Sequence, residues 1–355
     1  MDIQQATRSY EAWVAQYAKP VKPDLRLKHE RMASSPFVFL RGTFYRWLQL
    51  FQSGCESQVR APRVLAVGDL HIENFGTWRD AEGRLVWGVN DVDEAARLPY
   101  SLDLVRLATS AVLARREERL VISVPQICEA ILEGYLTALT RAGRPFVLAE
   151  RSTWLRDIAT NRLRDPVEFW RKLDALPAVT RDIPEKHLRA ALPDPRLECK
   201  FVRRIAGVGS LGRPRIVALA MWGGARIARE AKARVPSAAH WAQDRTPEPS
   251  AADARILAKA VHVADPFFSI DEKWVVRRLA PDCSRIEMVD LPFERDEARL
   301  LRAMGWEAAN IHLGSANRQL GEHLARQPKD WLEVAARAMA RAVVKDWRDW
   351  ATAGA

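Results

Sequence analysis

Apolar side chains recur every three or four positions in three long stretches of the chain, residues 37–51, 101–190 and 299–350. This is the period of helices that bury one face, so these stretches are predicted to be mainly helical. Pro36 suits the first turn of the first stretch, because a proline nitrogen has no hydrogen to leave unpaired there. Residues 1–35 are polar and charged and are expected to form one or two helices followed by a basic linker.

Short runs of β-branched and aromatic residues predict strands after the first helical stretch. Arg63–Val67 is one such run. Phe75–Trp78 and Leu85–Val89 flank Asp80–Gly83, whose aspartate and glycine are typical of a tight turn. This segment is therefore expected to form a strand, a loop and then a β-hairpin.

A second group of strands is predicted after a cluster of prolines that ends at Pro195. Cys199–Ile205 and Arg215–Trp222 bracket a glycine-rich turn, and Trp274–Leu279 is a further candidate strand. The whole pattern predicts an α+β fold in three parts: a helical part over residues 1–190, a β-rich part over 191–290 and a helical return over 291–355.

The composition is that of a folded protein with a basic excess. Of the 355 residues 48% are hydrophobic and 28% are charged, and the net charge is +10. Such an excess favours anionic partners: nucleotides, phosphorylated metabolites, nucleic acid or an acidic membrane surface. The four cysteines lie far apart and form no zinc or dithiol motif. No signal segment and no apolar run long enough to span a bilayer is recognisable, so a cytoplasmic location is expected.

The most informative motif follows the first predicted strand. In Gly68–Gly76, Asp69 precedes Asn74 by five positions, and His71 lies between them. At a phosphoryl-transfer site an aspartate orients the attacking hydroxyl and accepts its proton, while an asparagine oxygen is a ligand that suits magnesium. His71 would orient this loop or approach a phosphate. The alternative is a polar turn with a capping aspartate.

Asp91 and Asp93 follow the second strand of the predicted hairpin. Carboxylates at the end of a strand can bind a divalent cation, although an aspartate there could also cap the start of a helix. The two acidic segments together favour a phosphoryl-transfer site. Asp69 would then act on the acceptor hydroxyl. Magnesium would be held by Asn74, Asp91 and Asp93.

The glycine-rich turn contains Gly207, Gly209, Ser210 and Gly212. A dinucleotide-binding turn leads into a helix, but Pro214 and the β-branched run after it predict a strand instead. A glycine-rich turn between two strands is the arrangement that covers the phosphates of ATP in kinases. An ordinary hairpin with a glycine turn is the alternative.

A cation that contacts the nucleotide phosphates is expected on the next segment, where Arg229 and Lys232 are the candidates. Either one could instead lie on the solvated face of a helix. Further along the chain, one of Arg277 and Arg278 is expected to face the site. His312 lies in an apolar helical pattern and is expected to be a hydrogen-bonded core residue.

These motifs resemble those of aminoglycoside phosphotransferases and choline kinases. Gly68–Asn74 is similar to their catalytic loop, Val89–Asp91 to their metal-binding segment and Leu102–Leu104 to the segment with the aspartate that follows. The fuller resemblance, from about Phe37 to His312, is to an uncharacterised bacterial family, domain of unknown function 2252. It implies a protein-kinase-like fold of two lobes and supplies no substrate. The aspartate that follows, Asp103, is expected to be structural.

The order of the motifs departs from that of ordinary kinases, in which the glycine-rich loop comes before the catalytic loop. Here Gly207–Gly212 follows Asp69, and the segment before Asp69 is predicted to be helical, which leaves no place there for a five-stranded lobe. We therefore predict a circularly permuted kinase-like fold. Five antiparallel strands before residue 60 would contradict it.

The function that this predicts is an ATP- and magnesium-dependent phosphotransferase acting on an unknown hydroxyl-bearing small molecule. Nucleotidyl transfer on the same fold is an alternative, because the same metal carboxylates would serve it. A non-catalytic nucleotide- or nucleic-acid-binding protein on a kinase-like scaffold is another. The absence of a clustered basic stripe with interleaved aromatic residues disfavours nucleic acid as the partner. The oligomeric state is not predicted.

Overall fold

The computed structural model describes residues 1–149, 151–161, 165–246, 252–283, 291 and 294–353. The described helices are α1 (Ile3–Val14), α2 (Lys22–Ser34), α3 (Pro36–Gly42), α4 (Phe44–Gly54), α5 (Glu56–Val59), α6 (Tyr100–Arg116), α7 (Val124–Thr140), α8 (Thr153–Asn161), α9 (Pro166–Asp174), α10 (Glu185–Ala190), α11 (Ala238–Ala242), α12 (Ala252–Lys259), α13 (Glu294–Leu313), α14 (Arg318–Ala325) and α15 (Trp331–Ala353). None of these helices is long and apolar enough to cross a membrane.

The described strands are β1 (Arg63–Ala66), β2 (Phe75–Arg79), β3 (Leu85–Val89), β4 (Ala96–Pro99), β5 (Phe146–Val147), β6 (Lys200–Arg203), β7 (Arg215–Trp222), β8 (Ala225–Ala233), β9 (Ser269–Ile270) and β10 (Trp274–Leu279). They form three antiparallel sheets, with strand orders β1-β4, β2-β3-β5 and β6-β7-β8-β10-β9. The fold class is therefore α+β, as the sequence pattern predicted.

The predicted hairpin is present between β2 and β3, whose register runs from Phe75 opposite Val89 to Arg79 opposite Leu85. The carboxylate of Asp80 closes the turn by accepting hydrogen bonds from the backbone nitrogens two and four residues later, at 3.0 and 2.8 Å. The hairpin carries the chain directly from Asn74 to Asp91, so the two acidic segments lie at the same end of it.

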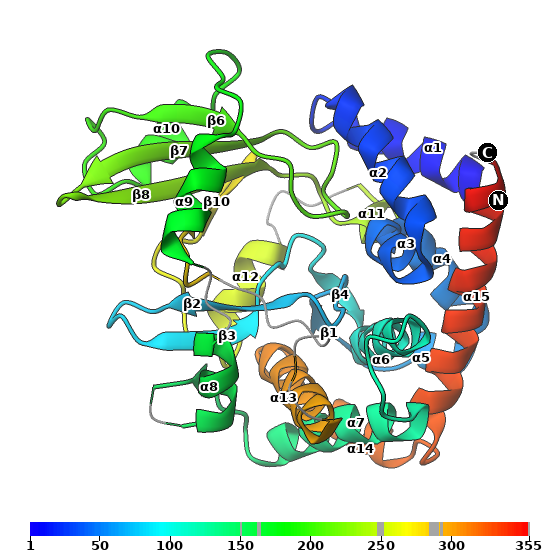
Figure 1. The fold of residues 1–355 in the computed structure, drawn as a ribbon. Coiled ribbons are helices and arrows are strands. Elements are labelled where there is room, and N and C mark those ends of the chain that lie inside the picture. The colour runs from blue at the N-terminus through cyan, green and yellow to red at the C-terminus, as the bar shows by residue number, and fades with distance from the viewer. Residues whose placement is uncertain (150, 162–164, 247–251, 284–290, 292–293, 354–355) are drawn as a thin grey trace.

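The five-stranded sheet lies apart from the helices α6, α7 and α13, at the upper left of Figure 1. Because side chains alternate along a strand, Glu230 and Lys232 of β8 share one face of this sheet while Arg229 and Ala231 share the other. Ala231 packs with Leu188 of α10 in a small apolar cluster on that other face. The face with Lys232 is the one that meets the acidic segments.

The main core surrounds α6, in which every side chain from Tyr100 to Ala114 is buried. A helix that is buried on all sides contains few charged residues unless they are paired, and the buried stretch of α6 from Tyr100 to Ala114 contains two, Asp103 and Arg106. The start of α1 and the end of α15 lie at one corner of the molecule, where these two helices are in contact (Figure 1).

Three local predictions were wrong in detail. Residues 37–51 form two helices, because Thr43 leaves helical geometry at φ −130° and its hydroxyl donates to the carbonyl of Phe39 at 2.7 Å. The expected basic linker is mostly helix α2, whose Lys28 and Met32 are buried. Residues 146–147, within a stretch predicted to be helical, add a short strand to the hairpin.

The segment with Arg229 and Lys232 is a strand and not the alternative helix. Residues 1–59 form α1 to α5 and contain no strand, so the arrangement that would have contradicted a permuted fold is absent from them. The boundary predicted between residues 290 and 291 is not tested, since residue 290 lies outside the described residues.

Candidate functional site

The loop that follows β1 is anchored by a buried carboxylate. The backbone nitrogens of Val67 and Gly68 donate to the two carboxylate oxygens of Asp103 at 2.7 and 2.9 Å, and Gly68 adopts a φ of +84°. His312 Nε2 lies 3.0 Å from Asp103, and its Nδ1 lies 2.8 Å from the hydroxyl of Tyr135. The prediction that Asp103 is structural and His312 a hydrogen-bonded core residue is confirmed.

Asp69, the next residue of this loop, is held by a buried arginine. Arg106 Nε donates to Asp69 Oδ1 at 2.8 Å, and Arg106 Nη2 also donates to this oxygen. The guanidinium is fixed by a hydrogen bond to the carbonyl of Leu40 at 2.9 Å and by the rings of Phe44 and Trp47. Burial raises the pKa of Asp69, although the charge of Arg106 opposes this shift.

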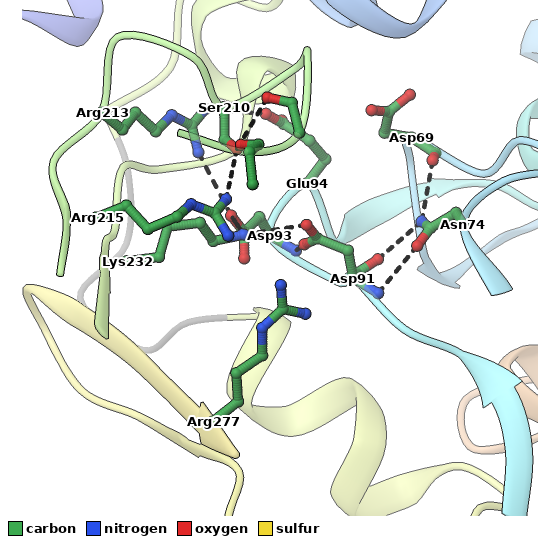
Figure 2. A network of polar contacts seen from close by, with 12 residues as sticks. Asp69, Asn74, Asp91, Asp93, Glu94, Ser210, Arg213, Arg215, Lys232 and Arg277 are labelled. Atoms are coloured by element: carbon green, nitrogen blue, oxygen red, sulfur yellow. Dashed lines mark hydrogen bonds and ion pairs between the residues drawn. The ribbon is translucent and has the colours of Figure 1, made fainter. Parts of the chain in front are cut away.

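Asn74 ties the two acidic segments together. Its Nδ2 donates to the carbonyls of Asp69 and Asp91 at 3.1 and 2.9 Å, and its Oδ1 accepts from the backbone nitrogen of Asp91 at 2.9 Å. As Figure 2 shows, this amide lies between the two segments, so Asn74 positions both aspartates. His71 is buried at the same cleft, with Nδ1 accepting from the backbone nitrogen of Glu73 at 3.2 Å.

Lys232 reaches from the sheet to both acidic residues that follow the hairpin (Figure 2). Its Nζ lies 3.0 Å from Asp91 Oδ2 and contacts Asp93 Oδ2. Burial alone raises the pKa of Asp91, but the charges of Lys232 and Arg277 outweigh burial and hold that pKa well below its usual range. Burial and the charge of Asp91 raise the pKa of Asp93. Asp91 is the more open carboxylate, with 41% of its side chain exposed.

A second cationic group surrounds Glu230 on the same face of the sheet. Arg215 Nη1 and Arg277 Nε donate to Glu230 Oε1 at 2.7 and 3.1 Å, and Arg204 contacts its other oxygen. Burial opposes ionisation of Glu230, but the three arginines hold its pKa well below the usual range. Three guanidinium groups around one carboxylate leave an excess of positive charge beside Lys232, which would suit an anionic ligand.

The glycine-rich turn lies over Asp69. A Cβ atom at Gly209 would stand 3.0 Å from the carbonyl of Arg41 and 3.6 Å from Asp69 Oδ2, so only a glycine fits comfortably there. Gly207 and Gly212 have φ values of +72° and +94°, which glycine tolerates. Ser210 Oγ accepts from Arg215 Nη2 at 2.8 Å, which joins the turn to the arginine group.

Arg229, the other cation considered from the sequence, is not brought to this cluster. Its Nε donates to the carbonyl of Ala191 at 2.7 Å, and its guanidinium lies over the ring of Phe267. Arg278 likewise contacts Asp282, whereas Arg277 faces Glu230. Because side chains alternate between the two faces of a strand, only one residue of each pair, Lys232 and Arg277, faces the site.

A cleft, partly open to solvent, lies between the turn, the Asp69 loop and helices α1 to α4. Its lining includes Lys28, Arg213 and Glu94, which sequence reasoning missed. Arg213 approaches Asp93 and Glu94 at 3.5 and 3.4 Å, and burial raises the pKa of Glu94 to about 7. A charged residue inside the apolar stretch of α6 is the signal that could have identified Arg106. Nothing local marks Lys28 as buried.

The described residues include no set of three or more histidine, cysteine or acidic side chains arranged to hold a metal ion. Magnesium, however, is usually bound by one or two carboxylates together with substrate phosphates. Asp91 and Asp93 fit that requirement, because both contact the same Lys232 nitrogen and Asp91 is open to solvent. Asn74 Oδ1 already accepts one hydrogen bond and has one lone pair left.

Residues 21–168 match the model of a family described as an uncharacterized protein conserved in bacteria, DUF2252. The matched segment includes Asp69, Asn74, Asp91 and Asp93, and it ends before the glycine-rich turn. This match supports the family suggested by the acidic motifs. Neither the curated proteins nor the solved structures yielded a match.

Proposed function

We propose that this protein is a phosphotransferase that uses ATP and magnesium to phosphorylate a hydroxyl group of a small molecule. The observation that carries the proposal is the convergence of four distant segments on one cleft. Asp69, Asp91 with Asp93, and the turn at Gly209 come from separate parts of the chain and line the cleft, and Lys232 reaches it through its contacts with Asp91 and Asp93. These are the residue types that a phosphoryl-transfer site requires.

Asp69 would orient the acceptor hydroxyl and accept its proton. Arg106 occupies Asp69 Oδ1, and the approach of Gly209 to Oδ2 marks that oxygen as the one facing the space under the turn. In the transfer, a bond forms between the acceptor oxygen and the terminal phosphorus. The bond between that phosphorus and the bridging oxygen breaks, and ADP leaves with the electron pair.

The turn Gly207–Gly212 would cover the phosphates, and Lys232 with Arg215 and Arg277 would neutralise their charge. Asp91 and Asp93 would hold magnesium, which when bound offsets the negative charge on the phosphate oxygens. Asn74 would fix the spacing between Asp69 and Asp91.

A permuted kinase-like architecture is part of the proposal. It is supported by a glycine-rich turn between the first two strands of a five-stranded antiparallel sheet and by a lysine on the third strand. It is also supported by the helices that precede Asp69 and by the contact between α1 and α15, the first and last described helices. The two lobes would be the sheet β6–β10 and the helical remainder. One departure is that Lys232 pairs with Asp91 and Asp93, where a protein kinase uses a helical glutamate.

The test is transfer of label from ATP to a bacterial small-molecule extract, with magnesium present. We expect γ-labelled ATP to yield a labelled metabolite. Asp69→Asn should lower the rate by about 10²- to 10⁴-fold, the usual worth of a positioned base. Asp349→Asn, at an exposed carboxylate of α15, is the matched control and should leave the rate unchanged.

Absence of transfer by the wild type, or equal transfer by Asp69→Asn, would contradict the proposal. Transfer of label from α-labelled ATP would support nucleotidyl transfer instead, because the α-phosphate stays on the leaving nucleotide in phosphoryl transfer.

A further inference from the structure

Lys28 on α2 is a buried cation that lines the cleft. Its residue is only 3% exposed, yet its Nζ makes no hydrogen bond or ion pair within the described part of the chain. Its Nζ lies over the ring of Tyr45, whose centre is 5.7 Å away. Burial lowers the pKa of Lys28 to about 8, which leaves the ammonium as the main form at neutral pH. Burying an unpaired charge is costly, so such a group calls for an explanation.

The carboxylates that line this cleft cannot supply the missing partner, because each already has a cation of its own. Asp69 is paired with Arg106, and Asp91 and Asp93 are paired with Lys232.

The remaining two are paired in the same way. Glu73 is held by Arg41, and Glu94 by Arg213. Arg41 also has its Nε buried without a hydrogen-bond partner in the described structure. The hydrogen-bond donors without a partner at this end of the cleft, on Lys28 and Arg41, therefore belong to positively charged groups.

Lys28 also stands where a second, smaller cleft joins the first. That cleft is bordered by α1, α2 and the glycine-rich turn, and it shares Tyr10, Lys28, Gly209 and Arg213 with the larger one. A small molecule seated here would therefore extend from Asp69, under Gly209, to Lys28. The rings of Tyr10 and Tyr45 would enclose it from the helical side.

Glu11 lies beside Lys28 in the smaller cleft, and its charge opposes the effect of burial on the Lys28 pKa, but it is hydrogen-bonded to His29 at 2.7 Å and not to Lys28.

We propose that the acceptor of the phosphotransferase is an alcohol that also carries an oxyanion, a carboxylate or a phosphate, and that Lys28 binds this oxyanion while Asp69 takes the hydroxyl. This proposal about the acceptor rests on the proposed function only for the transfer step, since binding of the anion by Lys28 requires no nucleotide. The pocket would select against acceptors with a positive charge, because Lys28 would repel them at short range in a site of low dielectric.

The first test is binding without ATP. Glycerate, glycerol 3-phosphate, glycerol and choline are small alcohols that carry a carboxylate, a phosphate, no charge and a positive charge. We expect the two anions to raise the melting temperature of the wild type and the other two to leave it unchanged. Lys28→Met should abolish the response, and Lys22→Met, at an exposed lysine of the same helix, should retain it. The relative sizes of the two anion responses tell which oxyanion the pocket prefers.

The second test uses the same four alcohols with labelled ATP and magnesium. We expect transfer to an anionic alcohol, with kcat/KM lowered by about 10- to 100-fold in Lys28→Met through KM, the effect of losing a charged hydrogen bond. No thermal response to either anion, an equal response in Lys28→Met, or preferred transfer to glycerol or choline would overturn the proposal. Anion binding that depends on Lys28 without transfer would support the anion site and count against the phosphotransferase alone.

Discussion

Lys232 and Lys28 are equally buried, each 3% exposed; Lys28 lines the cleft, and Lys232 contacts two carboxylates that line it. Lys232 has two carboxylate partners, Asp91 and Asp93, whereas Lys28 has none in the described residues. The difference separates the two ends of the site. At one end the protein supplies its own counter-charges to a lysine, and at the other end it leaves a lysine to be neutralised by a ligand. Removal of each charge should therefore change the stability of the ligand-free protein in opposite directions.

The largest effect is expected for Lys232→Met. It would leave Asp91 and Asp93 without their shared cation, and breaking a buried pair from one side is strongly destabilising. We expect the free energy of unfolding to fall by about 2 to 4 kcal/mol. This is somewhat less than the usual cost of removing one partner of a fully buried ion pair, because Asp91 is partly exposed. Urea denaturation of this variant beside Lys22→Met measures it. A stability equal to that of the wild type would mean that the pairing is not the role of Lys232.

Lys28→Met should change the free energy of unfolding in the opposite direction. Methionine keeps the apolar stem of the side chain but removes the unpaired charge, so the free energy of unfolding should rise by about 1 to 3 kcal/mol at pH 7. The same urea measurement applies. A loss of stability in Lys28→Met would show that the ammonium has a partner in the folded protein and would remove the contrast between the two lysines.

The pH dependence sharpens this prediction. The pKa of Lys28 is about 8 in the folded protein and 10.5 in its ordinary state, so the unfolded chain binds the extra proton first as the pH falls. The loss of stability that the buried charge of Lys28 causes should therefore be fully present below pH 8 and should fade as the pH rises from 8 to 10.5. We expect the stability difference between Lys28→Met and the wild type to shrink across this window by up to about 1.4 kcal/mol per pH unit. A constant difference would contradict the assigned burial effect.

The smallest effect is expected at Ser210, whose hydroxyl accepts a hydrogen bond from Arg215 and so orients this arginine beside Lys232. Ser210→Ala should raise the KM for ATP by about 2- to 10-fold, the worth of one hydrogen bond, and leave the thermal response to anionic alcohols intact. Ser53→Ala, at an exposed serine of α4, is the control. A changed anion response in Ser210→Ala would mean that the two ends of the cleft are not independent.

The sequence predicted those parts of the molecule that depend on local spacing. The hairpin from Phe75 to Val89 was predicted from two short apolar runs on either side of a turn with Asp80 and Gly83. Because Asn74 precedes this hairpin and Asp91 follows it, the sequence also predicted that these two residues lie close together. The choice between Arg229 and Lys232 stayed open because it depends on the face of a strand, and the segment could also be read as a helix. The strand register then decides it, since only Lys232 faces the acidic segments.

Lys28 and Arg106 were missed for a different reason. Each is buried by segments that are distant in the chain, and burial of a charge is not visible in the pattern around it. Lys28 lies in a stretch that is basic throughout, where a solvated side chain is the ordinary expectation. The packing of α2 against the glycine-rich turn, with the backbone nitrogen of Val21 donating to the carbonyl of Gly212 at 2.9 Å, helps to bring α2 to the site.

The most direct measurement is the affinity for ATP with magnesium, obtained by titration calorimetry on the wild type, Lys232→Met and Lys28→Met. If Lys232 serves the nucleotide and Lys28 the acceptor, Lys28→Met should bind ATP as tightly as the wild type, while Lys232→Met should bind at least about 10-fold more weakly. Wild-type binding in Lys232→Met, or an equal loss in both variants, would contradict the division of the cleft between two substrates.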